Sequence, residues 1–256
     1  ILVLGAGKMG AFFVDLLSFD HETAVMDINP YRLRFMYNTQ RFTSYEEIDA
    51  FAPELVINAV TLKATKQIFS DVIPHLPKDC ILADIASVKT GLQEFYAQKG
   101  MRFVSTHPMF GPTFANLGKL ADENAIIITE GDYMGRLFFR DLYSRLGLHV
   151  HECSFEEHDD TMAYSLSIPF VSTFVFAAVM KRPDAPGTTF KRHLAIAKGV
   201  LGEDEGLSRE ILFNPRTAGQ VLKVGERLQE LSAIIENRDE KALSGFLAEI
   251  RKRVLG

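Results

Sequence analysis

The stretch ILVLGAGKMG, residues 1–10, carries the strongest structural signal in the chain. Its first four residues are apolar and predict a buried strand, and its glycines follow at once in the pattern Gly-x-Gly-x-x-Gly. Gly5 permits a tight turn, Gly7 lets the backbone approach a pyrophosphate, and Gly10 lets the next helix pack closely on the strand. A strand, these glycines and a helix in this order predict a dinucleotide-binding Rossmann unit.

An acidic residue ends the second predicted strand. Asp27 follows Gly7 by 20 residues, where a carboxylate can accept hydrogen bonds from adenosine ribose hydroxyls and would repel a 2′-phosphate. We therefore expect NAD rather than NADP, although Arg32 and Arg34 could bind that phosphate if Asp27 turned away. The residues expected to contact the cofactor are Gly5, Ala6, Gly7, Lys8, Met9, Gly10, Asp27, Val60 and Thr61.

Residues 1–153 alternate short apolar runs with amphipathic stretches, which is typical of an α/β fold with crossover helices. We predict an N-terminal Rossmann domain over these residues, with a doubly wound, mostly parallel sheet. Helices are predicted at 9–18, 65–73 and 135–146. The predicted strands are 1–4, 23–27, 55–60, 81–85, 103–106, 125–129 and 148–153.

The pattern becomes helical from Ser154, which forms a capping-box pattern with Glu157. We predict an all-helical C-terminal domain, residues 154–256, with about four helices. The expected breaks are 182–187, 202–206 and 214–219. Residues 162–180 carry no charge and approach the length of a bilayer span. A helix that protein buries on most sides is the better interpretation, and the sheet domain or a second subunit would have to cover it.

Charge and cysteine content exclude several classes of function. A net charge of -5 disfavours binding to nucleic acid. The two cysteines, Cys80 and Cys153, form no disulfide framework, so we expect a reducing, cytoplasmic environment. We also expect no signal peptide and no membrane partner.

Two predicted strand ends carry side chains suited to chemistry. Ligands of a doubly wound sheet bind beyond the carboxyl ends of its strands. Ser87 follows the strand at 81–85, and His107 follows the strand at 103–106. An imidazole titrates near neutral pH and can remove a hydroxyl proton while a hydride leaves for a nicotinamide. The alternatives are a His107 that is merely packed and hydrogen-bonded, and a Ser87 that caps the next helix.

Several motifs together resemble the prephenate dehydrogenase family, which includes bacterial cyclohexadienyl dehydrogenases. The most specific is STHPMFGP at residues 105–112, about 20 residues after DIASVK at residues 84–89. The similarity extends over essentially the whole chain. Its other parts are GAGKMG at 5–10, EHD at 157–159 and FKRHLAIAK at 190–198.

The resemblance implies a Rossmann domain joined to a helical dimerisation domain, with the active site between them and a homodimer as the assembly. The family's catalytic histidine corresponds to His107, and its strand-end serine, which hydrogen-bonds the histidine or the substrate hydroxyl, corresponds to Ser87. The implied reaction is NAD-dependent oxidation and decarboxylation of prephenate to 4-hydroxyphenylpyruvate, in tyrosine biosynthesis. Arogenate, which has the same ring carboxylate and ring hydroxyl, would give tyrosine.

The chain departs from the family where the substrate carboxylates should bind. Many members have an arginine at the position of Ala195, so we expect Lys191, Arg192 and Lys198 to replace it, with a solvated basic helix face as the alternative. Relatives often have a histidine at the position of Phe170. By resemblance Thr113 lies near the substrate, as a polar contact or as part of a turn.

Other classes of protein stay open. His149, His151, Cys153 and His158 are suitable zinc ligands, but their spacing matches no standard zinc module, so we expect no metal. A dinucleotide domain could sense redox state without turnover. A hydroxyacid dehydrogenase similar to 6-phosphogluconate dehydrogenases would share both domains, but these enzymes typically use a lysine of the helical domain as acid and base. The motif at 105–112 favours the cyclohexadienyl interpretation.

Overall fold

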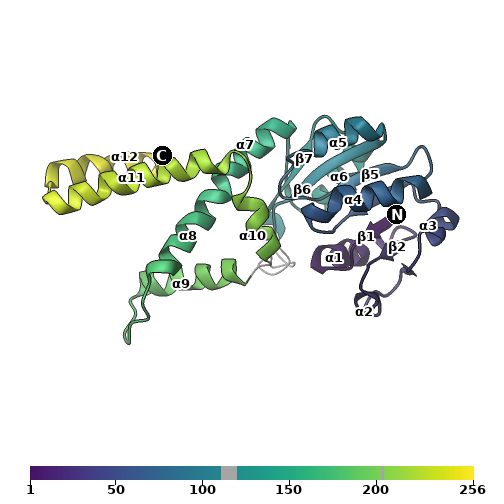
Figure 1. Cartoon of the computed structure of the whole chain (residues 1–256), viewed down its shortest axis with the longest axis horizontal. Coiled ribbons are helices and arrows are strands. Elements are labelled where there is room, and N and C mark those ends of the chain that lie inside the picture. The colour runs from purple at the N-terminus through teal and green to yellow at the C-terminus, as the bar shows by residue number, and fades with distance from the viewer. Residues whose placement is uncertain (111–119, 203–204) are drawn as a thin grey trace.

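The computed structural model describes residues 1–110, 120–202 and 205–256 of the chain. It has two parts (Figure 1): a sheet with helices packed on it, and a group of helices that projects from one end of the sheet. Helices α11 and α12 form an antiparallel pair at the far end of this projection.

One eight-stranded sheet has the order β3-β2-β1-β4-β5-β6-β7-β8. The strands β1 to β6 are all parallel, β7 is antiparallel to β6, and β8 is parallel to β7. The predicted doubly wound, mostly parallel sheet is therefore confirmed. The strands are β1 (Leu2–Leu4), β2 (Ala24–Met26), β3 (Gln40–Phe42), β4 (Leu55–Asn58), β5 (Ile81–Asp84), β6 (Arg102–Pro108), β7 (Asn124–Ile128) and β8 (His149–Cys153).

Helices cover both faces of this sheet because successive strand residues point to opposite sides. Val3 packs in one core with Phe13 and Phe139, which come from α1 and α6. Leu2 packs in the other with Phe69, from α4, and with residues of α5. The helical elements of this part are α1 (Lys8–Leu17), α2 (Pro30–Leu33), α3 (Glu46–Phe51), α4 (Leu62–Val72), η1 (Ile73–His75), α5 (Leu92–Lys99), η2 (Leu120–Asp122) and α6 (Tyr133–Arg145).

The strand β3 was not predicted from the sequence. It has three residues, of which only Phe42 is buried while Gln40 and Arg41 are exposed. An edge strand this short has too few residues to show an alternating pattern.

The helical part begins directly after β8. The predicted capping box forms, because the Ser154 side chain accepts from Glu157 N–H and the Glu157 side chain accepts from Ser154 N–H. Six helices follow among the described residues, two more than expected, because breaks at Leu166 and Arg238 were missed. Arg238 is left-handed, with φ 51°, and ends α11. The helices are α7 (Phe155–Ser165), α8 (Ser167–Val179), α9 (Thr188–Leu201), α10 (Glu205–Leu212), α11 (Thr217–Asn237) and α12 (Glu240–Leu255).

Residues 162–180 were predicted to form a helix buried on most sides, by the sheet domain or by a second subunit, and they fall almost entirely in the apolar segment Phe155–Val179, which the chain itself leaves largely uncovered. Only 17% of its most apolar window is buried within the chain, and in α8 the buried residues are Ser167 and Phe170. Its length and composition would also suit a membrane span, but this is a weak indication because core helices of soluble proteins share them. Helices α7, α9, α10 and α11 pack on α8 and leave the rest of it uncovered.

Candidate active site

The glycine loop after β1 has the geometry of a phosphate-binding turn. Gly5 has φ +95°, a conformation that other residues rarely adopt, and its N–H donates to Met26 O at 2.7 Å. A Cβ on Gly10 would lie 1.8 Å from Gly5 O, so the helix can pack this closely only with glycine. A Cβ on Gly7 would meet no atom within 4 Å. The loop therefore leaves open space beside Gly7, at the start of α1, where first-turn amides can bind a phosphate.

Asp27 faces this loop and does not turn away from it. Its Oδ2 accepts from Ala6 N–H at 2.7 Å, and its Oδ1 accepts from Asn29 N–H at 2.7 Å. Arg32 Nη1 lies 3.6 Å from Oδ2, and only 4% of the Asp27 side chain is exposed. Each carboxylate oxygen has a second lone pair that stays available to a ribose hydroxyl.

The remaining expected cofactor contacts lie at the same edge of the sheet. Lys8 and Met9 form the first turn of α1, and Val60 Cγ1 lies 3.0 Å from where a Gly5 Cβ would be. Thr61 is exposed and precedes α4. The switch in strand order between β1 and β4 puts the ligand crevice of a doubly wound sheet here.

His107 is the second-last residue of β6, and 5% of its surface is exposed. Its Nδ1 lies 3.0 Å from Nε2 of His158, a residue of α7. Burial first, and then the proximity of His158 and Lys89, hold the pKa of His107 well below the ordinary value for imidazole. The ring is therefore neutral at neutral pH and can accept a proton.

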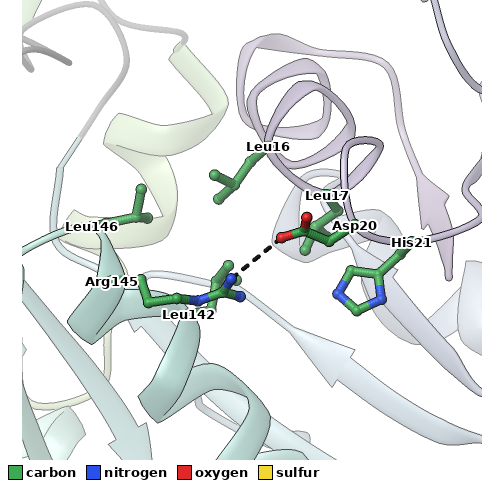
Figure 2. A pocket seen from close by; sticks show the side chains of 7 residues that line it. All are labelled: Leu16, Leu17, Asp20, His21, Leu142, Arg145 and Leu146. Atoms are coloured by element: carbon green, nitrogen blue, oxygen red, sulfur yellow. Dashed lines mark hydrogen bonds and ion pairs between the residues drawn. The ribbon is translucent and has the colours of Figure 1, made fainter.

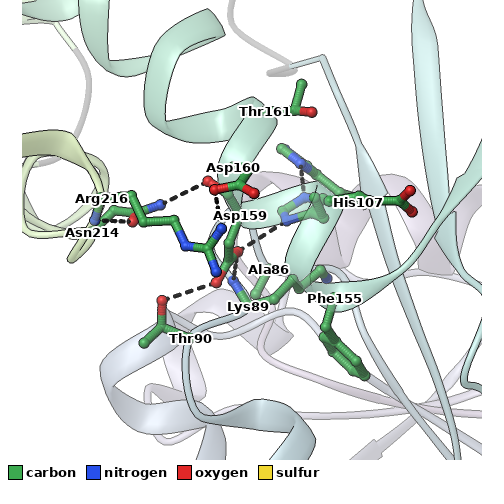
Figure 3. A network of polar contacts seen from close by, with 12 residues as sticks. Ala86, Lys89, Thr90, His107, Phe155, Asp159, Asp160, Thr161, Asn214 and Arg216 are labelled. Atoms are coloured by element: carbon green, nitrogen blue, oxygen red, sulfur yellow. Dashed lines mark hydrogen bonds and ion pairs between the residues drawn. The ribbon is translucent and has the colours of Figure 1, made fainter. Parts of the chain in front are cut away.

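The residues after His158 tie α7 to the sheet (Figure 3). Asp159 Oδ1 lies 3.1 Å from His158 Nδ1 and accepts from Lys89 N–H at 3.0 Å, and Asp159 Oδ2 accepts from the Thr90 hydroxyl at 3.0 Å. Burial would raise the pKa of Asp159, but the hydrogen bonds from His158 and Lys89 outweigh it and hold that pKa below its ordinary value. The carboxylate is therefore ionised.

A buried ion pair connects the ends of β5 and β6. Lys89 Nζ lies 2.6 Å from Asp84 Oδ1 and donates to Thr106 O at 2.8 Å, while Tyr96 OH donates to Asp84 Oδ2 at 2.8 Å. Both charged side chains are essentially inaccessible to solvent. Burial lowers the pKa of Lys89, and Asp84 only partly opposes this. The pair joins β5 to β6 next to His107, which gives the motif at 84–89 a structural role that the sequence did not reveal.

Comparison with known proteins places this arrangement in a family. Residues 11–146, more than half of the chain, match the family model described as "Prephenate dehydrogenase, nucleotide-binding domain". The chain belongs to the prephenate dehydrogenase family.

Individual relatives of this family are distant. The "Probable arogenate/prephenate dehydrogenase" of Methanocaldococcus jannaschii is 24% identical over 78% of this chain, and a "T-protein" of Enterobacter agglomerans is 25% identical over 98% of it. The chain spans 47% of the length of the first relative and 65% of the second. A crystal structure of prephenate dehydrogenase from A. aeolicus, in complex with hydroxyphenyl propionate and NAD+, has a TM-score of 0.83 at 23% identity. That alignment covers 99% of this chain and 96% of the A. aeolicus chain.

The structure gives no support for the expected roles of two polar residues, Ser87 and Thr113. Ser87 is half-buried in the bend after β5, and its hydroxyl has no hydrogen-bond partner among the described residues. The serine caps no helix, and its catalytic role stays a prediction. Thr113 lies outside the described residues.

The structure does not bring the predicted substrate cations to His107. Lys191, Arg192 and Lys198 are exposed on α9, which packs mainly on α8. A different cation, Arg216, lies beside the network of Figure 3, where it pairs with Asp160. The sequence marked residues 214–219 only as a helix break, so it gave no sign of this pairing.

Neither a metal cluster among the described residues nor the cavity between α1 and α6 coincides with this site. In the described part of the chain no three His, Cys, Asp or Glu side chains are placed to hold a metal ion, and His158 bonds His107 instead. A cavity of about 170 Å³ lies between α1 and α6, bridged by the ion pair of Asp20 and Arg145 (Figure 2). It is lined by Leu16, Leu17, Asp20, His21, Leu142, Arg145 and Leu146, none of which comes from the glycine loop or a strand end.

Proposed function

We propose that this chain catalyses the NAD-dependent oxidative decarboxylation of prephenate to 4-hydroxyphenylpyruvate, a step of tyrosine biosynthesis. The observation that carries the proposal is the buried imidazole of His107 at the sheet edge that also bears the glycine loop. Three strand spacings separate β1 from β6, or about 14 Å at about 4.8 Å each. A dinucleotide whose pyrophosphate lies at β1 can extend its nicotinamide toward β6.

The residues of the loop fit NAD. The open space beside Gly7 admits a pyrophosphate, and the Asp27 carboxylate faces the position of the adenosine ribose, where it would repel a 2′-phosphate. The solved A. aeolicus relative holds NAD+, which supports the same cofactor here. When bound, NAD supplies the hydride acceptor.

The role of His107 follows from its protonation state. The neutral ring takes the proton of the substrate's ring hydroxyl, while the hydrogen on the same carbon leaves with its electron pair as hydride. The bond to the ring carboxylate then breaks and carbon dioxide leaves; the electrons of that bond make the ring aromatic and end on the former hydroxyl oxygen, which takes back the proton from His107. Burial of the base keeps its lone pair from water.

Arogenate is a second candidate substrate, supported by the M. jannaschii relative, a "Probable arogenate/prephenate dehydrogenase". The deciding experiment measures the initial rate of reduced-nicotinamide formation with prephenate and with arogenate, each paired with NAD and with NADP. We expect the highest rate with prephenate and NAD. Four inactive mixtures, with NAD still bound, would contradict the proposal and favour a hydroxyacid dehydrogenase or a redox sensor.

We also propose a homodimer formed through the helical part, in a reducing cytoplasm. The uncovered apolar side chains of α8, which include Val175 at 49% and Val179 at 74% exposure, support a second copy as their cover. Both cysteines are free, which suits a reducing compartment. Light scattering of the purified chain should give twice the chain mass, and a monomer at micromolar concentration would contradict the assembly.

A further inference from the structure

Three side chains form a continuous polar line from α7 to the end of β6. His107 Nδ1 lies 3.0 Å from His158 Nε2, and His158 Nδ1 lies 3.1 Å from Asp159 Oδ1. His158 is fully buried, and each of its two ring nitrogens lies within hydrogen-bond distance of one of these partners. Because a neutral imidazole has one donor and one acceptor nitrogen, the protons on this line are not independent.

The ionised carboxylate fixes the order of donors and acceptors. Asp159 can only accept, so His158 Nδ1 carries a hydrogen and donates it. The other nitrogen of a neutral His158 is then an acceptor, and His107 Nδ1 must donate to it. The lone pair of His107 is left on Nε2, the nitrogen that is not bound to α7.

The opposite order requires a second proton on His158. If His158 were doubly protonated, its Nε2 would donate to His107 Nδ1, and the hydrogen of a neutral His107 would move to Nε2. Burial lowers the pKa of His158, and the hydrogen bond to Asp159 only partly opposes this. The charged groups that face the two rings are Lys89, Asp84 and Asp159, and Lys89 also disfavours a cationic ring.

Asp159 is itself held from the sheet side. Lys89 N–H and the Thr90 hydroxyl donate to its two oxygens at 3.0 Å each. The carboxylate therefore cannot rotate away from His158 without losing both bonds. One end of this line, Asp159, is therefore held by the loop after β5, and the other end, His107, belongs to β6.

We infer that His158, held by Asp159, is a positioning residue that fixes the tautomer of His107, with the hydrogen on Nδ1 and the basic lone pair on Nε2. The inference deepens the proposed function and rests on it for the identity of the base. It assigns to the His-Asp pair at residues 158–159 an effect on catalysis without any contact with substrate.

The tautomer can be read directly, without turnover. In protein labelled with ¹⁵N-histidine, the His107 signals are assigned by their absence in His107→Asn. At neutral pH we expect Nδ1 to be protonated and Nε2 to be unprotonated in the unaltered chain. A hydrogen on Nε2 would overturn the inference. Because this readout needs no substrate, it separates failure of the inference from failure of the proposed reaction.

Two variants of His158 then test the effect on rate. His158→Gln keeps an oxygen that can accept from His107 Nδ1, whereas His158→Leu keeps bulk and removes the acceptor. We expect kcat to fall about 100-fold in His158→Leu, with KM within about threefold, and to recover at least about tenfold in His158→Gln. The dissociation constant of NAD should not change in either variant. Equal kcat in the unaltered chain and His158→Leu would show that His158 only packs. If His158→Leu does not fold, the labelled unaltered chain still decides.

Discussion

The Asp27 carboxylate accepts the N–H of Ala6 at 2.7 Å, which joins the end of β2 to the glycine loop. Asp27 therefore has a structural task besides any contact with a ribose. The strands β1 and β2 are neighbours in the sheet, and this hydrogen bond connects the residues that directly follow their carboxyl ends. A substitution of Asp27 that keeps one acceptor oxygen changes the charge and can preserve the hydrogen bond to Ala6.

Asp27→Asn should shift the cofactor preference toward NADP. The amide oxygen can still accept from Ala6, at the cost of the second bond from Asn29 N–H, while the charge that repels a 2′-phosphate is lost and Arg32 remains nearby. We expect the ratio of kcat/KM for NADP to that for NAD to rise at least about tenfold. The measurement is steady-state kinetics with both cofactors. An unchanged ratio would mean that Asp27 does not face the ribose.

Two glycines of the loop should respond differently to alanine. A Cβ on Gly10 would lie 1.8 Å from Gly5 O, so Gly10→Ala should lower the free energy of unfolding by about 2 kcal/mol or more. Gly7 has an ordinary φ of -73° and open space around it, so Gly7→Ala should change that free energy by less than about 1 kcal/mol. NAD affinity should nevertheless fall in Gly7→Ala, because the new methyl group occupies the space for the pyrophosphate. Urea unfolding and NAD titration of both variants test this, and normal NAD affinity in Gly7→Ala would contradict the site.

His107→Asn should abolish most turnover and leave NAD affinity unchanged. The asparagine cannot take the hydroxyl proton, and general-base catalysis contributes about 100-fold to 10,000-fold to a rate. The glycine loop follows β1, which is separated from β6, the strand of His107, by β4 and β5. Initial rates with prephenate, together with calorimetric titration of NAD, make the test. A rate close to that of the unaltered chain would exclude His107 as the base.

Acid should destabilise the fold through two buried histidines. Burial is the largest cause of the lowered pKa of both His107 and His158. The unfolded chain binds protons at these rings as the pH falls through about 6.5, while the folded chain does so only at lower pH. The free energy of unfolding is therefore at its full value above about pH 6.5 and declines below it, by at most about 1.4 kcal/mol per pH unit for each ring.

Urea unfolding at pH 7.5 and at pH 5.5 measures this decline. His158→Gln should show a smaller difference between the two pH values, because one of the two rings is gone. The control is His149→Gln, at an exposed position on β8, which should leave the difference unchanged. A free energy of unfolding that is the same at both pH values would contradict the burial of neutral rings.

Local signals made much of the sheet domain predictable, since Gly5, Gly7 and Gly10 lie within six residues of one another. Contacts between distant segments were not predictable. His158 was recognised in the EHD motif and as a potential metal ligand but not as a partner of His107, which lies 51 residues away in the sequence. The Lys89 and Asp84 pair was missed for a related reason: a lysine is normally exposed, and only the fold shows that its charge is buried. The sequence predicted that protein covers α8 but not which protein, because composition does not distinguish a chain's own interior from a surface that another chain covers.

Three cations of α9 were predicted to bind the carboxylates of the substrate. Lys191, Arg192 and Lys198 are exposed on α9, which packs mainly on α8. If one of them binds a carboxylate, its replacement by alanine should raise the KM for prephenate about tenfold or more, since a hydrogen bond to a charged group contributes about 1.5–3 kcal/mol. The KM for NAD should stay the same, and Lys241→Ala, on α12, serves as the control.

The pattern of KM values also locates the site. A change confined to Lys198→Ala would point to the last turn of α9, next to α10, as the part that approaches substrate. An unchanged KM in all three variants would remove α9 from the site. Arg216 would then be the cation to test, because it already lies beside the network that holds His107, and a carboxylate of the substrate could compete with Asp160 for it.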